Sequence, residues 1–123
     1  MLAAFASEFG LPEETAIKIA APFGAGISRT GGICGVVNGG LMVLGLKFAS
    51  PASGNKDGVY SKSREFIQRF REKQGSMACP DLIGFDLSFP DQYVKAKSAQ
   101  VFNTVCPGLI EGSVEIILGL IGS

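Results

Sequence analysis

Apolar residues recur along this chain mostly at the spacing of helix faces. Between residues 59 and 74, three apolar side chains share one face, and an oppositely charged pair stands four residues apart on another, as in an amphipathic surface helix. No segment shows the strict apolar and polar alternation of a half-buried strand. The apolar set is Phe66, Ile67 and Phe70, and the charged pair is Glu65 and Arg69.

Glycine and proline punctuate the other helical segments and set their expected ends. The pattern predicts one all-α domain over residues 1–123, an irregular bundle of about five or six helices. Residues 23–32 hold four glycines and predict a loop that delivers Cys34 and lets backbone approach something closely. The expected helical segments are residues 1–9, 12–22, 34–48, 59–74, a short turn at 79–83, 92–105, and 106 onward.

The most apolar segment, residues 33–48, predicts a buried core helix. It is shorter than the roughly 20 apolar residues that span a bilayer, so we expect no membrane span. Gly35, Gly39 and Gly40 would each cost this helix about 1 kcal/mol relative to alanine. Close helix packing is the expected compensation.

Composition narrows the function classes. Eleven basic residues balance eleven acidic ones, so the positive field that attracts nucleic acid is missing and we expect no nucleic-acid partner. Histidine is absent, which removes the usual base of Ser/His/Asp sites and the commonest zinc ligand. An odd cysteine count and the lack of a secretory signal pattern predict a cytoplasmic protein.

The remaining candidate chemistry lies in three cysteines, each at a predicted helix start. Cys34 follows two glycines, whereas Cys79 and Cys106 each precede a proline. Unpaired N–H groups and the positive end of the helix dipole favour thiolate over thiol, so we expect lowered pKa values. Cysteine is also a small apolar residue that is often buried without any reactive role, and that alternative interpretation remains open.

The motif CGVVNG, from Cys34 to Gly39, resembles the Cys-Gly-Ala-x-x-Gly motif of the C_GCAxxG_C_C redox-active proteins, with Val36 in place of alanine. The segments AFASEFGLPEETAIKIAAPFGAGI, GGLMVLGLKF and FIQRFREKQGSMACPDLIGFDL also look similar, so the resemblance covers nearly the whole chain. The family pattern has four cysteines, and the first would lie a few residues before Met1. We expect upstream codons to encode it. The resemblance implies thiol redox chemistry, and a similarity to part of the split-Soret cytochromes implies an iron–sulfur site.

Three functions from different classes follow. In a redox protein, Cys34 is the reactive thiolate, Cys79 or Cys106 is the resolving thiol, and the redox partner is unknown. Gly35, Gly39 and Arg29 are assigned to cofactor binding, and the positive charge of Arg29 would stabilise the thiolate. In a metal protein, the three cysteines hold zinc, copper(I) or an iron–sulfur cluster. An upstream cysteine, Asp81 or a symmetry mate would complete that site. In a structural protein, the helix carrying Gly39, Gly40 and Gly45 forms a homodimer surface.

A phosphate site is disfavoured. The loop GAGISRTGG lacks the Gly-Lys-Ser/Thr ending of a phosphate-binding loop, and Gly32-Ile33-Cys34 stands there instead. Five basic residues between 62 and 73 alternate with Glu65 and Glu72, which indicates a solvated helix face. They are Lys62, Arg64, Arg69, Arg71 and Lys73.

Overall fold

The computed structural model describes residues 1–122 and confirms the all-α class. No strand occurs within that range, and a single isolated antiparallel bridge joins Ile33 to Ala78. The helical segments outnumber the five or six expected, because several short turns are separate elements. They are α1 (Leu2–Ala6), α2 (Glu13–Ala20), α3 (Gly24–Arg29), α4 (Gly35–Phe48), α5 (Asp57–Gln74), α6 (Cys79–Ile83), α7 (Pro90–Ser98), α8 (Val101–Thr104) and α9 (Cys106–Ile121), with 3₁₀ turns η1 (Ser7–Phe9) and η2 (Ala21–Phe23).

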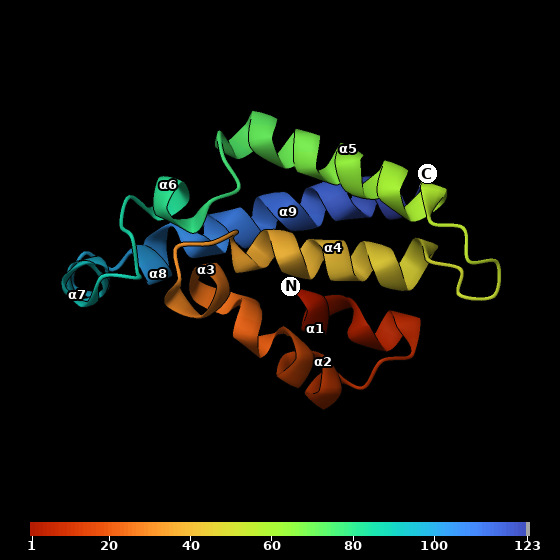
Figure 1. Ribbon diagram of the computed structural model, residues 1–123, viewed down its shortest axis with the longest axis horizontal. Coiled ribbons are helices and arrows are strands. Elements are labelled where there is room, and N and C mark those ends of the chain that lie inside the picture. The colour runs from red at the N-terminus through yellow and green to blue at the C-terminus, as the bar shows by residue number, and fades with distance from the viewer. Residues whose placement is uncertain (123) are drawn as a thin grey trace.

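Three long helices, α4, α5 and α9, run side by side along the molecule (Figure 1). Helices α1, α2 and α3 cover one side of α4, and α6, α7 and α8 gather at the end where α4 and α9 both begin. The three predicted cysteine positions therefore come to one end of the molecule. Large side chains from the long helices fill the core between them: Val37, Val43 and Leu44 of α4, Phe66 and Phe70 of α5, and Ile117 and Leu120 of α9.

The glycines of α4 confirm the expectation of close packing within the subunit. A Cβ on Gly40 would lie 2.5 Å from Cζ of Phe66, and a Cβ on Gly39 would lie 2.8 Å from Cβ of Met1. Real Cβ atoms do not approach that closely, so a larger residue at either place would force its neighbour to shift. Gly45, in contrast, has open space where its Cβ would be. The homodimer surface predicted from Gly39, Gly40 and Gly45 stays a prediction. Of these three glycines, only Gly45 is not packed against another part of the subunit.

Residues 25–29 differ from the expected flexible loop. All five have positive φ, between 53° and 67°, and so form a left-handed helical turn. L-residues avoid this conformation at a cost of about 1–2 kcal/mol each. Hydrogen bonds hold the turn: the Ser28 hydroxyl donates to the Pro22 carbonyl (2.8 Å), and the Thr30 hydroxyl donates to the Ile27 carbonyl (2.7 Å). The segment is an ordered, strained element next to the first cysteine.

The predicted helix at 92–105 is wrong as a single element. It begins earlier, at Pro90, and is interrupted near Gln100, whose φ of 58° is left-handed. The α8–α9 run, Val101–Ile121, is long and apolar enough to cross a membrane by length and composition. In this fold one face of it packs against α4 and α5, with Leu109, Ile117 and Leu120 buried, while Ile110 and Leu118 are exposed. The expectation of no membrane span stays a prediction.

Candidate functional site: a cavity lined by three thiols

All three cysteines lie at helix starts, as predicted. Cys34 is the residue before α4, and Cys79 and Cys106 are the first residues of α6 and α9, each followed by proline. The isolated bridge fixes the first two relative to each other. The Cys34 N–H donates to the Met77 carbonyl (2.8 Å), and the Cys79 N–H donates to the Gly32 carbonyl (3.0 Å). Because side chains alternate along paired strands, Cys34 and Cys79 project from the same face of the bridge.

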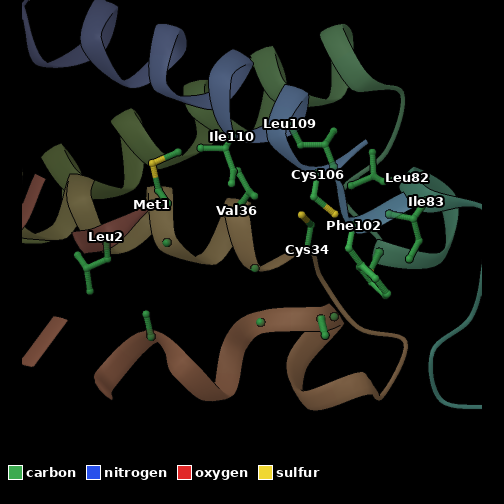
Figure 2. A pocket seen from close by; sticks show the side chains of 17 residues that line it. Met1, Leu2, Cys34, Val36, Leu82, Ile83, Phe102, Cys106, Leu109 and Ile110 are labelled. Atoms are coloured by element: carbon green, nitrogen blue, oxygen red, sulfur yellow. The ribbon is translucent and has the colours of Figure 1, made fainter. Parts of the chain in front are cut away.

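The three cysteines line one cavity of about 330 Å³. Figure 2 shows the side chains of Cys34, at the start of α4, and Cys106, at the start of α9, reaching into the same end of the cavity. Leu82 and Ile83 of α6 and Phe102 of α8 enclose the same end. Cys34 and Cys79 are each 7% exposed, whereas Cys106 is half-buried. A small molecule in this cavity would therefore meet thiols from three different helices.

Burial raises the pKa of every thiol, and the expectation of lowered pKa values is therefore wrong. Removal from water raises the pKa of Cys34, while the N–H groups of Val36 and Val37 act in the opposite direction without forming a capping hydrogen bond to the sulfur. The pKa of Cys79 rises to about 11 through burial, then through repulsion from Cys34, Cys106 and the Asp86 carboxylate. Burial and the Cys34 sulfur raise the pKa of Cys106. The cysteines do lie at helix starts, but their removal from water raises the pKa values by more than the helix starts lower them.

Glycines let the backbone close around this cavity. A Cβ on Gly26 would lie 2.8 Å from Cβ and 3.3 Å from Sγ of Cys79, so the left-handed turn packs directly on that cysteine. Gly35 and Gly39 line the cavity, as the site assignment requires, but their missing Cβ atoms make room for other parts of the chain. On Gly35, a Cβ would lie 2.8 Å from the Phe23 carbonyl oxygen. Their role toward a cofactor stays a prediction.

The structure places Arg29 against Tyr93. Its guanidinium carbon lies 3.9 Å from the centre of the Tyr93 ring, and Nη2 donates to the Tyr93 hydroxyl (3.0 Å). Arg29 is not among the residues that line the cavity. The contact joins the left-handed turn to α7, and the predicted role in stabilising the Cys34 thiolate stays untested.

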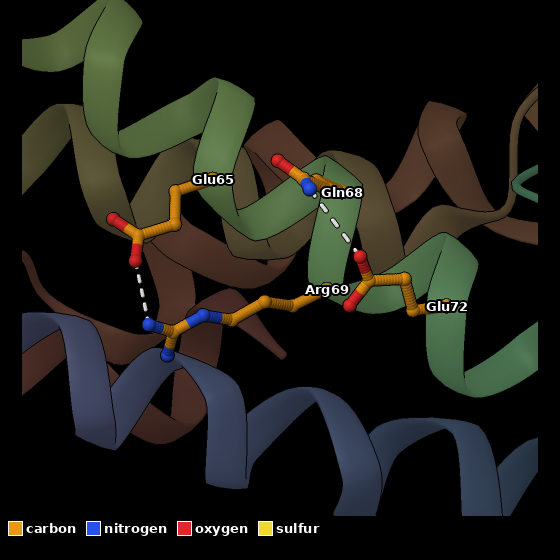
Figure 3. Close-up of polar contacts among 4 residues, drawn as sticks. All are labelled: Glu65, Gln68, Arg69 and Glu72. Atoms are coloured by element: carbon orange, nitrogen blue, oxygen red, sulfur yellow. Dashed lines mark hydrogen bonds and ion pairs between the residues drawn. The ribbon is translucent and has the colours of Figure 1, made fainter.

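None of the basic residues of α5 lines this cavity. On the exposed face of α5, Arg69 pairs with Glu65, and Gln68 donates to Glu72 (Figure 3). Lys73 pairs across the helices with Glu115 of α9 (3.0 Å). The apolar face made by Phe66 and Phe70 is fully buried, which confirms that part of the sequence interpretation.

Within residues 1–122, no group of three or more His, Cys, Asp or Glu side chains is arranged to hold a metal ion. The carboxylate of Asp81 accepts a hydrogen bond from the Ser76 hydroxyl (2.8 Å) and does not line the cavity. The described residues thus do not by themselves supply a zinc or iron–sulfur site. That hypothesis stays a prediction from the sequence.

Sequence reasoning missed the apolar walls of the cavity. In the sequence these wall residues look like ordinary core or surface positions of helices, and no local signal marks them as site residues. They include Leu82, Phe102, Leu109 and Ile110. Only the helix packing brings them around the thiols.

A family model described as "Putative redox-active protein (C_GCAxxG_C_C)" matches residues 1–120. No curated protein and no solved structure matched the chain.

Proposed function

This chain belongs to the C_GCAxxG_C_C family, and we propose that it performs thiol–disulfide exchange through Cys34 and Cys106. The observation that supports this pair is that both side chains reach into the same end of the cavity from the starts of α4 and α9. Cys34 raises the pKa of Cys106, and both raise the pKa of Cys79, which agrees with all three thiols lying near one another. Cys106 is also the most exposed of the three thiols and so the easiest for a partner to reach.

Cys34 is the attacking thiol in this proposal, because it is the one of the three on which N–H groups act to lower the pKa, although burial raises that pKa overall. Its thiol first loses a proton to solvent. The thiolate then attacks one sulfur of a substrate disulfide, and the other sulfur leaves as a thiolate that takes up a proton. Cys106, after losing its own proton, attacks the mixed disulfide, forms the Cys34–Cys106 bond and releases the second substrate thiol. Two protein thiols are oxidised and one disulfide is reduced.

Cys79 remains a thiol throughout this cycle. Its pKa of about 11 leaves it almost fully protonated at neutral pH, and the protonated form is a poor nucleophile. Its position beside Gly26 and on the same face as Cys34 makes it a wall of the cavity. We therefore assign it to shaping the site.

Peptide mapping tests this assignment. Reduced protein is oxidised with bis(2-hydroxyethyl) disulfide, alkylated and cut with trypsin, which places each cysteine in its own peptide because basic residues separate them. The expected product is a Cys34–Cys106 link with Cys79 alkylated. Cys106→Ser should trap a mixed disulfide at Cys34, and the matched control Cys79→Ser should retain the link. Three free thiols after oxidation would contradict the proposal, and so would a disulfide between the two remaining cysteines that forms equally well in Cys34→Ser.

A further inference from the structure

The walls of the thiol cavity carry no polar or charged side chain. All of the residues that line it are glycine, alanine, cysteine or larger apolar residues. An ion entering such a space loses water and meets no charged or polar side chain, only backbone N–H groups such as those at the start of α4, so its entry is costly. The cavity therefore discriminates against charge through its composition.

The size and opening of the cavity admit a small molecule. Its volume of about 330 Å³ lies at the lower end of the roughly 300–1,000 Å³ that ligand pockets occupy. Three of its lining residues, Gly24, Ala25 and Ile110, are themselves exposed, so the cavity reaches the surface there. A compact organic molecule can enter, whereas a folded partner protein cannot.

A nearby carboxylate adds to this discrimination. Asp86 follows α6 and acts electrostatically on the Cys79 sulfur, raising its pKa. The same negative charge repels an anion placed beside Cys79. The loss of water is therefore the main effect opposing an anionic substrate, because Asp86 does not line the cavity and is the smallest of the influences that raise the Cys79 pKa.

We infer that the substrate of the cavity is a small, uncharged, apolar organic disulfide, which the two protein thiols reduce to two organic thiols. This inference rests on the proposed exchange between Cys34 and Cys106. The bonds broken and formed are those of that exchange: the substrate S–S bond breaks, the Cys34–Cys106 bond forms, and each organic sulfur leaves with a proton. Charged disulfides of the same length are poor substrates.

Two disulfides with the same skeleton test the inference: dimethyl 3,3′-dithiodipropionate, which is neutral, and 3,3′-dithiodipropionate, a dianion. Peptide mapping measures the rate at which the protein disulfide forms with each reagent. Each rate is divided by the rate of reaction of the same reagent with the chain unfolded in urea, so that differences in intrinsic reactivity between the two reagents cancel. The normalised rate should favour the neutral ester by about tenfold or more, since a tenfold preference needs only about 1.4 kcal/mol.

A charge placed at the opening provides the matched comparison. Ile110 lines the cavity and is 40% exposed, whereas Leu118 of the same helix is 56% exposed and does not line it. Ile110→Lys should reduce the preference for the neutral ester by about two- to fivefold, the effect of an exposed ion pair, and Leu118→Lys should leave it unchanged. Equal normalised rates for the two reagents, with the Cys34–Cys106 link still forming, would overturn the inference alone. Failure of the link with both reagents and with bis(2-hydroxyethyl) disulfide would overturn the proposed function itself.

Discussion

At the scale of single residues, two opposing effects act on each thiol. A helix start favours thiolate, and the sequence places all three cysteines there. Burial favours the neutral thiol, and the fold buries Cys34 and Cys79 almost completely. Burial is the larger effect for each of the three sulfurs. The helix positions were predictable from neighbouring glycine and proline, but the sign of the pKa change was not, because it depends on side chains distant in sequence.

The left-handed turn at residues 25–29 is a second residue-scale feature. Ala25 has φ 53° and lines the cavity. Ala25→Gly should stabilise the fold by about 1 kcal/mol, because relief of about 1–2 kcal/mol of left-handed strain exceeds the added entropy of the unfolded chain, about 0.4–1 kcal/mol. Urea unfolding followed by circular dichroism measures the change.

The control for that substitution is Ala4→Gly, at an exposed position in the right-handed helix α1. It should destabilise the protein by about 0.5–1 kcal/mol, the usual cost of glycine in a helix. If both substitutions destabilise to the same extent, residues 25–29 are not held in a strained conformation in solution.

At the scale of elements, α4 shows how the same residue type can be required at one position and replaceable at another. Gly40 faces the ring of Phe66, and Gly45 faces open space. Gly40→Ala should destabilise the protein by about 1–3 kcal/mol through overpacking against a buried ring. Gly45→Ala should stabilise it by up to about 1 kcal/mol through helix propensity alone.

The two alanine variants are compared by urea unfolding of the reduced protein. Because both lie in one helix and differ only in what a methyl group would meet, opposite signs isolate the packing of α4 on α5. A stabilising Gly40→Ala would mean that Phe66 moves aside freely and that the close approach is not required.

The helix ends marked by glycine were the most predictable part of these elements. Gly10, Gly75 and Gly84 end helices with left-handed φ, as their positions in the sequence indicate. The left-handed turn was not predictable, because four of its five residues are not glycine, and tertiary contacts such as Arg29 on Tyr93 join its local hydrogen bonds in holding them there. Local sequence identifies favourable conformations and misses those imposed by packing.

At the scale of the whole molecule, the fold assembles a site from residues far apart in the chain. Cys34, Cys79 and Cys106 were recognisable as candidates from their positions and from the CGVVNG motif. The cavity walls were not, because Leu82, Leu109 and other apolar residues look the same whether they line a site or a core. The sequence thus identified the chemical groups, and the packing of α4, α6 and α9 determined the environment in which they act.

That environment makes the stability of the reduced protein depend on alkaline pH. The pKa of Cys79 is 9.0 ordinarily and about 11 in the fold, so between these values the native state holds a proton that the unfolded chain has released. Stability falls with rising pH wherever the native state binds more protons than the unfolded state. The contribution is fully present below pH 9 and is lost as pH rises through about 11. Cys34 and Cys106 act in the same direction, since burial raises the pKa of each.

The test is urea unfolding of the reduced protein from pH 7 to pH 11, with a phosphine reductant present so that no disulfide forms. The free energy of unfolding should fall steadily above pH 9, and the fall should be smaller in Cys79→Ser, which lacks the titrating thiol. Taking the difference between the two proteins at each pH removes every other effect of pH that they share. A difference that stays constant across the range would show that Cys79 ionises equally well in the folded and unfolded chains, and the cavity would then be open to water at that sulfur.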